Sequence, residues 1–436
     1  MKTIKTRFIY TYINIIIWIV LYFVLNDNNA KAIGQIATLL LIINAAYLIK
    51  RTITAKNSLL LVVFTFMSLY IWPAKLFFFD NLYFSRHNMQ YTYNTAAFIT
   101  LLFLLFIIAF TFFVKIERSS KIKEIRFRKN DIIFYGLYII SFFIILFFRR
   151  SGSHYDGNSS DVQVSPLYEY NLILLLTIYI YTNNEKKKQI LFNALCSIYV
   201  FFTIIVGGRI EVILLGFILL AIKYQYIISF KKIIFFLFIG IWCMSTFESI
   251  RRDPLMIFTS DVIEIINPFK EKVNPYNSQV SNEGDVLWAS ERMIVLLEEN
   301  IIQTTDRVKS AFLYFISPYV PFSKLPPIAN LANYKTDIYS SGGGGLAIAY
   351  FYVMFGLLGV IGLAYFLSRI IYILYKGKTF HQFYALLAIM TFARWFVYNP
   401  IHIIKFCIWG VFFFYMVISL DYTIKKCRFL TKKNNI

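Results

Sequence analysis

The stretch TAAFITLLFLLFIIAFTFFV, residues 95–114, contains twenty residues and no charge. A helix needs about 20 apolar residues to cross the hydrocarbon core of a bilayer. Runs of similar length recur along almost the whole chain of 436 residues, which is 58% hydrophobic and only 15% charged. Soluble proteins carry about 25% charged residues. The composition excludes an ordinary cytosolic enzyme, a disordered protein and a disulfide scaffold. It predicts an all-α, polytopic membrane protein.

We predict about twelve transmembrane helices, of which the eighth and ninth are the weakest by length. Nine of them fall in residues 1–247 and three in 345–436, where a basic tail follows. Residues 248–344 form one large, partly helical loop between them. The predicted spans are 8–25, 32–49, 57–79, 95–114, 131–148, 166–182, 189–207, 210–222, 233–247, 345–367, 381–399 and 403–420.

The basic residues predict which side of the membrane each connection faces. With both termini in the cytoplasm, the cytoplasmic connections hold 27 Lys and Arg residues, against 8 in the other short connections. Short cytoplasmic loops collect Lys and Arg, whereas long loops carry little topological information. We therefore expect both termini in the cytoplasm and the large loop outside. The first apolar run lacks a small-residue cleavage site, so it reads as a span rather than a signal peptide.

The formal charge of +21 would suggest nucleic acid in a soluble protein, but here the cytoplasmic loops account for it. We expect no nucleic-acid partner. The four cysteines show no metal-ligand or disulfide spacing: three lie in apolar runs and one in the tail, at Cys196, Cys243, Cys407 and Cys427. We expect no metal and no cofactor.

The large loop is nearly neutral, with 12 acidic and 9 basic residues. Residues 288–301 predict an amphipathic helix that places Trp288 on its apolar face and Glu291 and Arg292 on its polar face. A second helix is predicted over 306–316. Prolines then interrupt regular structure, and the glycines at 342–345 lead into the tenth span. A loop of this length with its own helices is usually functional.

Ionisable residues gather near the predicted outer ends of the spans, and the inner halves hold almost none. Because a charge within the membrane is costly, such residues indicate a function by default. Their one-sided distribution predicts a polar site that opens to the outside. For any one of these residues, the alternative to a functional role is that its side chain snorkels to the interface or forms a structural ion pair. The group comprises Glu169, Arg209, Glu211, Glu248, Arg394, His402 and Lys405.

Several arginines suit a phosphate ligand, since guanidinium offers a bidentate fork. Arg209 follows a Gly207-Gly208 turn, and Arg251 and Arg252 lie one turn after Glu248, where an exposed ion pair is the alternative. Arg292 has the weaker case, with a solvated helix face as its alternative. Arg394, about 9 Å below the outer surface, and His402 complete the set.

Absent motifs narrow the donor. The sequence has no P-loop, no GxGxxG and no HExxH. The cytoplasmic loops also lack a close acid pair that would hold a metal-bound nucleotide sugar. A lipid-linked donor held by arginines without a metal fits better.

Two stretches resemble bacterial oligosaccharide repeat-unit polymerases, the O-antigen and capsular polysaccharide polymerase family. One is Ile316-Ser-Pro-Tyr-Val-Pro. The other is Ser341-Gly-Gly-Gly-Gly followed by a Tyr…Phe-Gly356…Gly span. Gly207-Gly208-Arg209 and Glu248 to Arg252 are similar to that family's glycine–arginine turn and to the start of its large loop. Residues 347–349 are apolar here, whereas many members carry an acid after the glycine cluster.

The resemblance implies a glycosyltransferase of polysaccharide biosynthesis in the bacterial cytoplasmic membrane, with the large loop in the periplasm. It would join undecaprenyl-diphosphate-linked oligosaccharides, which serve as donor and acceptor. Arg209, Arg251 and Arg252 would stabilise the diphosphate, Glu248 or Glu211 would be the base, and Arg394 and His402 would hold the second substrate. A chain-length regulator and a flippase are possible partners. A flippase of the same lipid-linked glycan and an O-antigen ligase are the rival functions.

Overall fold

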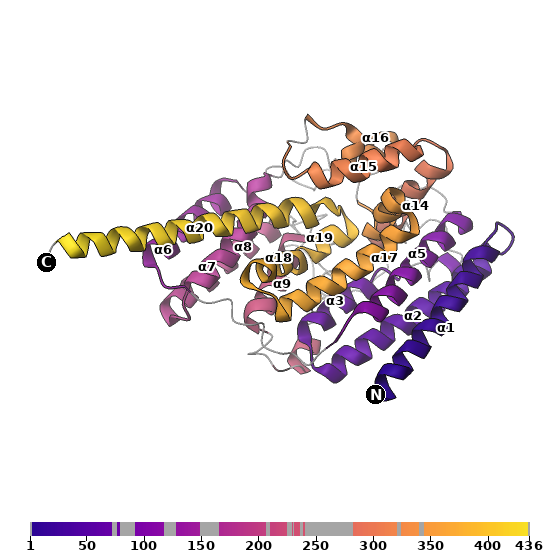
Figure 1. Ribbon diagram of the computed structural model, residues 1–436, viewed down its shortest axis with the longest axis horizontal. Coiled ribbons are helices and arrows are strands. Elements are labelled where there is room, and N and C mark those ends of the chain that lie inside the picture. The colour runs from indigo at the N-terminus through magenta and orange to yellow at the C-terminus, as the bar shows by residue number, and fades with distance from the viewer. Residues whose placement is uncertain are drawn as a thin grey trace, which may run out of the picture. The chain divides into compact units, whose positions relative to one another are not determined.

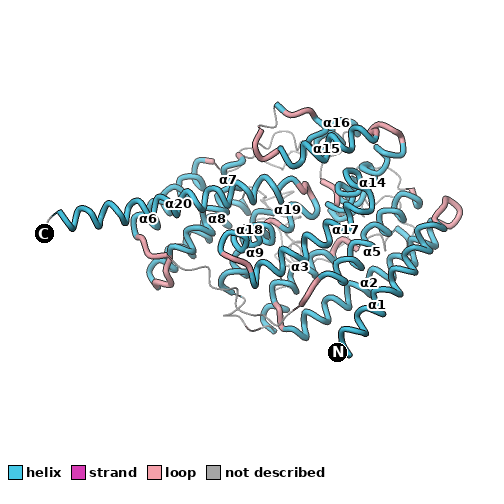
Figure 2. The backbone as a smooth tube through the Cα atoms, viewed as in Figure 1, coloured by secondary structure: helices cyan, strands magenta, loops and turns pink. Residues whose placement is uncertain are grey.

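The computed structural model describes residues 2–71, 76–78, 92–116, 128–148, 165–205, 210–224, 229, 231–235, 239, 282–320, 324–339 and 344–434. Within these ranges every regular element is a helix (Figure 2). The chain divides into two compact units. The first comprises residues 1–120, 271–375 and 391–405, and the second comprises 121–270, 376–390 and 406–436.

The elements of the first unit are α1 (Lys2–Val24), α2 (Ala30–Ala55), α3 (Ser58–Ser68), α5 (Tyr93–Phe113), α14 (Asn282–Glu298), α15 (Thr304–Ile316), the 3₁₀ turn η5 (Pro327–Ala329), α16 (Leu331–Tyr339), α17 (Ala347–Lys376), α19 (Phe392–Val397) and the first turn of α20 (Ile401–Asn434). The second unit holds α6 (Asp131–Phe147), α7 (Pro166–Tyr181), α8 (Lys186–Ile205), α9 (Ile210–Leu219), the π-helical turn η3 (Leu220–Tyr224), α18 (Thr379–Met390) and the rest of α20.

Four of the described helices are long and apolar enough to cross a bilayer: Ala30–Ala55, Tyr93–Phe113, Ala347–Lys376 and Ile401–Cys427. Six shorter apolar helices accompany them. The predicted all-α class is therefore confirmed for this part of the chain, and its apolar helices fit a membrane protein.

In the first unit, α5 packs along both α1 and α2 (Figure 1). Two polar side chains inside this packing find hydrogen-bond partners within it. The Trp18 indole donates to the Leu101 carbonyl at 2.7 Å, and the Asn44 amide donates to Asn14 Oδ1 at 2.9 Å. Buried polar groups need such partners because burial without a hydrogen bond is costly. The loop helices α14, α15 and α16 gather beyond one end of the long helices (Figure 1).

A buried carboxylate organises one end of the second unit. Asp421 on α20 is 1% exposed and accepts from Asn130 Nδ2 at 2.7 Å and Lys425 Nζ at 3.0 Å. The Tyr181 hydroxyl and Arg128 Nη1 lie at 3.4 and 3.5 Å from its Oδ2. These contacts bring together the start of α6, the end of α7 and the C-terminal half of α20. Charge-assisted hydrogen bonds of this kind offset the cost of burying the carboxylate.

Two predicted spans differ from the structure. Residues 381–399 form two helices rather than one, because the chain turns at Thr391, whose carbonyl accepts from Arg394 N and Trp395 N. Thr commonly occupies the position that begins a helix. Within the third span, predicted over 57–79, α3 ends at Ser68 and residues 69–71 are not helical, whereas residues 76–78 are.

Two further features of the helices were not predicted. The predicted tenth span corresponds to α17, which is longer than expected and bends at Gly356, where φ is 64° and ψ is −152°. The segment predicted as the large loop contains a third helix, α16, after its run of prolines. Leu331, Ala332 and Lys335 are buried on one face of α16, and this spacing was visible in the sequence.

Candidate functional site

The predicted site residues fall into three groups. Arg209, Glu248, Arg251 and Arg252 lie outside the described residues. Glu211 belongs to the second unit. Arg292, Arg394 and His402 belong to the first unit, on α14, α19 and α20. For Arg292, Arg394 and His402, the structure shows contacts between the segments that carry them.

Gly344 and Gly345, the end of the glycine cluster, pack against two other segments. Gly345 lies beside Ser290 of α14, and the Leu346 amide donates to Ser290 Oγ at 2.8 Å. Gly344 lies so close to the Tyr398 carbonyl that a β-carbon would overlap it. Glycine is needed here because only a residue without a side chain allows this approach of two backbones.

The turn Tyr398–Pro400, between α19 and α20, is held from three directions. The Tyr350 hydroxyl of α17 donates to the Tyr398 carbonyl at 3.2 Å. The Tyr314 hydroxyl of α15 donates to the Pro400 carbonyl at 2.9 Å. Asn399 Nδ2 donates to Oδ1 of Asn330, just before α16, at 2.9 Å. The loop helices thus fix the position of this turn.

Arg394 and His402 flank the Tyr398–Pro400 turn, and both are half-buried. The Arg394 guanidinium lies over the Tyr398 ring, 5.5 Å from its centroid, and the Arg394 carbonyl accepts from the Tyr398 and Asn399 amides. His402 is in the first turn of α20, where its amide donates to the Asn399 carbonyl at 3.3 Å. Because the turn is fixed, both side chains start from a defined backbone.

Arg292 lies between two aromatic rings. Its guanidinium carbon is 5.5 Å from the centroid of Trp288 and 5.7 Å from that of Tyr339 on α16. The Tyr339 hydroxyl in turn donates to Glu299 Oε2 at 3.0 Å. Aromatic faces attract a cation without using its N–H donors. Among the described residues no ion pair to Arg292 is present, and the side chain is half-buried rather than on a fully solvated face.

Glu291 is the polar residue that the sequence interpretation misplaced. It was predicted on the exposed face of α14, but it is 0% exposed, and neither carboxylate oxygen has a hydrogen-bond partner in the described part of the chain. Burial raises the pKa of the Glu291 carboxyl well above its usual range, with Arg292 opposing and Glu298 adding to the shift. Its spacing of three from both Trp288 and Ile294 places it on the apolar face, a signal that was present in the sequence.

A second buried ionisable group lies on α16. Lys335 is 0% exposed, and burial lowers the pKa of its ammonium group to about 8. Tyr339, on the same helix, has its pKa raised to about 12 by burial and by its hydrogen bond to Glu299. The loop helices therefore carry charged groups in a region that is partly shielded from water.

Glu211 is 2% exposed in the first turn of α9, in the second unit. The N-terminus of a helix carries a partial positive charge that stabilises an acidic side chain there. Glu169 has the same position in α7, where it is 9% exposed. Both acids thus occupy favourable positions for a buried carboxylate.

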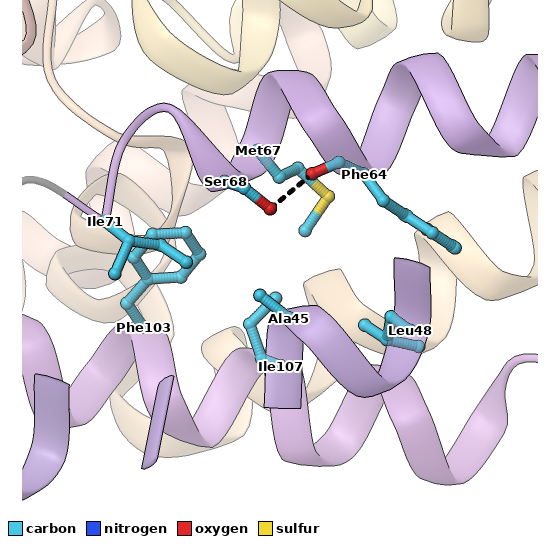
Figure 3. Close-up of a pocket in the computed structure, with 8 residues that line it drawn as sticks. All are labelled: Ala45, Leu48, Phe64, Met67, Ser68, Ile71, Phe103 and Ile107. Carbon is cyan, nitrogen blue, oxygen red and sulfur yellow. Dashed lines mark hydrogen bonds between the residues drawn. The ribbon is translucent and has the colours of Figure 1, made fainter. Parts of the chain in front are cut away.

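The cavity drawn in Figure 3 does not contain this site. It lies among α2, α3 and α5, has a volume of about 10 Å³, and its one polar lining side chain, Ser68, donates to the Phe64 carbonyl at 2.7 Å. That volume is at the limit for a single water molecule, so no sugar fits. No group of three or more potential metal ligands is found among the described residues.

The arrangement suits an anionic ligand with an attached polar group. Two arginines, each against an aromatic ring, are carried by segments that meet at Gly344 and Gly345. Guanidinium groups bind phosphate oxygens bidentately. Comparison with protein-family models, curated proteins and solved structures gives no match for this chain.

Proposed function

We propose that the protein is a polysaccharide polymerase, a glycosyltransferase that joins undecaprenyl-diphosphate-linked oligosaccharide repeat units at the outer face of the bacterial cytoplasmic membrane. One observation carries the proposal: Gly344 and Gly345 pack between α14, which bears Arg292, and the Tyr398–Pro400 turn, which lies between Arg394 and His402. The glycine cluster is also the motif on which the family resemblance chiefly rests.

In the proposed reaction a hydroxyl of the acceptor's terminal sugar attacks the anomeric carbon of the donor glycan. The bond from that carbon to the diphosphate oxygen breaks, the hydroxyl proton passes to a base, and undecaprenyl diphosphate leaves. Negative charge grows on the diphosphate, so fixed cations accelerate the step. Arg209, Arg251 and Arg252 are the proposed diphosphate ligands, with Arg292, Arg394 and His402 holding the glycan and the second substrate.

The proposed base is Glu211 or Glu248. A base must come within hydrogen-bond reach of the proton it removes. Glu211 lies in the first turn of α9 and is 2% exposed. No metal or cofactor is needed in this scheme because the arginines supply the positive charge.

We also propose twelve spans with both termini in the cytoplasm. Contacts between helix ends support this topology, because they join ends that it places on the same side of the membrane. Tyr375 at the end of α17 donates to Asn57, between α2 and α3, at 3.1 Å, and both lie on the proposed cytoplasmic side. Gln35 near the start of α2 donates to the Phe77 carbonyl at 2.9 Å, and both lie on the proposed outer side.

The rival functions predict different arrangements. A flippase needs cations along a path through both leaflets, whereas the candidate cations here occur near one side of the sequence-predicted spans. An O-antigen ligase shares the donor and the topology, so the chain's residues separate it less well. It stands as the second candidate because the same arginine-based diphosphate binding would serve it.

The decisive experiment is complementation of a strain that lacks the gene, with surface-glycan chain lengths as the readout. We expect Arg394→Ala and Arg209→Ala to leave only single repeat units while the protein remains in the membrane. Arg369→Ala, an exposed arginine of α17 outside the proposed site, is the matched control and should restore long chains. Normal chain lengths with both site variants would refute the proposal.

The deletion strain separates the rivals. Loss of long chains with one repeat unit retained indicates a polymerase. Absence of any extracytoplasmic lipid-linked intermediate indicates a flippase. Accumulation of free lipid-linked polymer indicates a ligase, and either of the last two results would overturn the proposed polymerase function.

A further inference from the structure

Helix α15 has the reverse of the polarity expected for a helix on a soluble domain. Three of its large apolar side chains, Val308, Phe312 and Phe315, are exposed, whereas Ser310 and, directly after the helix, Ser317 are buried at 1% and 0% exposure. Four outward side chains, which we name the α15 stripe, are between 56% and 71% exposed: Val308, Phe312, Phe315 and Tyr319. Val308, Phe312 and Phe315, spaced by four and three residues, lie along one line of the helix surface, and Tyr319 follows three residues after the helix ends at Ile316.

The orientation of α15 is fixed by contacts on its other face. The Tyr314 hydroxyl binds the Pro400 carbonyl at 2.9 Å, and its ring packs edge-on to Phe351 of α17. A capping box between Gln303 and Asp306 defines the start of the helix. Rotating the stripe inward would break these contacts. The outward direction of the stripe is therefore a property of the folded unit.

The α15 stripe continues onto the exposed surface of a helix that can cross a bilayer. The Phe315 ring lies 6.4 Å from that of Phe355 on α17. Phe355 is 37% exposed, and Leu358, one turn further along α17, is 78% exposed. An apolar surface on a spanning helix is expected to face lipid chains.

The length of α17 gives the depth of this contact. Basic residues, Arg369 and Lys376, mark one end of the helix, where side chains reach headgroups. About 20 residues cross the hydrocarbon core. Counting back that number from Arg369 gives residue 349, and counting back from Lys376 gives residue 356. Phe355 falls within this boundary region. The stripe beside it is therefore level with the membrane interface at the opposite end of α17.

We infer that the α15 stripe is embedded in the interfacial region of the bilayer, among phospholipid headgroups and the first segments of their acyl chains. The leaflet is the one opposite the Arg369–Lys376 end of α17, which is the outer leaflet in the proposed topology. Part of the large loop is then a membrane-surface element rather than a wholly aqueous one. This inference is independent of the proposed glycosyl transfer.

The test uses the full-length protein with its four cysteines replaced by alanine and a single new cysteine carrying an environment-sensitive fluorophore. Phe312→Cys probes the stripe, and Val308→Cys provides a second position in it. Lys309→Cys, exposed on the next residue of the same helix, is the water-facing control. Leu358→Cys is the lipid-facing reference. Each is reconstituted in phosphatidylcholine–phosphatidylglycerol vesicles.

We expect a nitroxide placed near the lipid headgroup to quench the label at position 312 or 308 strongly, as at 358. Aqueous iodide should quench the label at 309 instead. Iodide quenching at both stripe positions, equal to that at 309, would overturn the inference. Shielding of both stripe positions from both quenchers, with disulfides forming between copies, would overturn it in favour of a second copy of the chain.

Discussion

Arg307 of α15 donates from Nε to the Val353 carbonyl of α17 at 2.6 Å, and from Nη2 to the Tyr352 carbonyl at 3.2 Å. The two carbonyls lie just before the bend at Gly356, where the helical hydrogen bonds are interrupted. Carbonyls freed by a bend need other donors when they are shielded from water. A side chain of α15 therefore completes the backbone of α17, one of the helices long and apolar enough to cross a bilayer.

Replacing Arg307 by alanine should lower the free energy of unfolding by about 2 kcal/mol, because it removes charge-assisted hydrogen bonds and leaves two carbonyls without their donors. Chemical unfolding in mixed micelles measures the change. Lys309→Ala on the same helix is the control and should change stability by less than about 0.5 kcal/mol. An equal effect of the two substitutions would show that the contact with α17 contributes nothing.

Replacing Gly356 by alanine should also destabilise the protein. The backbone there has φ of 64° and ψ of −152°, a conformation that essentially only glycine adopts, so a β-carbon adds strain of about 1–3 kcal/mol. Gly362, later in α17, has open space around its α-carbon. Gly362→Ala should instead stabilise the helix by about 0.5–1 kcal/mol. The same unfolding assay compares both, and stabilisation by Gly356→Ala would contradict the strained geometry.

Gly344→Ala should impair the proposed polymerisation while the protein still reaches the membrane. The new methyl group would overlap the Tyr398 carbonyl, so the turn that lies between Arg394 and His402 must move. A displacement of about 1 Å at a reacting site lowers rates by about a hundredfold. Surface-glycan chain lengths measure the effect. Gly136→Ala on α6, where the added carbon meets nothing, is the control and should leave chain lengths unchanged.

The sequence predicted well those features that follow from apolar run length. The bounds of α5 and α15 agree with the predicted ranges within two residues, because a run of apolar residues or an amphipathic period sets each of them. It did not predict the break at Thr391 or the bend at Gly356. The bend at Gly356 is accompanied by the Arg307 hydrogen bonds to α17, a tertiary contact that local propensity does not encode.

The residue types of the candidate site could be predicted from the sequence, but the residues that its arginines contact could not. Arginine in the loop and at the span ends suggested anion binding, and Arg292, Arg394 and His402 do lie in one unit. The aromatic rings that hold the two arginines come from within four residues in the case of Trp288 and Tyr398, but from a separate helix in the case of Tyr339. A contact between distant segments leaves no trace in a single sequence.

Glu291→Gln should make the protein relatively more stable as pH rises. The unfolded carboxyl titrates near its ordinary value of 4.5, whereas burial raises the pKa of Glu291 in the folded state. Between these two values the folded state binds more protons, so the native protein loses stability as pH increases. Glutamine is neutral throughout and avoids this loss. The stability of the variant minus that of the wild type should therefore be larger at about pH 8 than at about pH 5.

Thermal unfolding in detergent at the two pH values measures this difference, in which the contributions of other titrating groups cancel. Glu185→Gln provides a control of opposite sign. A hydrogen bond from Lys188 lowers the pKa of the Glu185 carboxyl, so the native state gains rather than loses from its ionisation. The relative stability of that variant should not increase with pH. A difference for Glu291→Gln that stays constant from acidic to basic pH would mean that Glu291 is solvated, and the packing of α14 described above would be wrong.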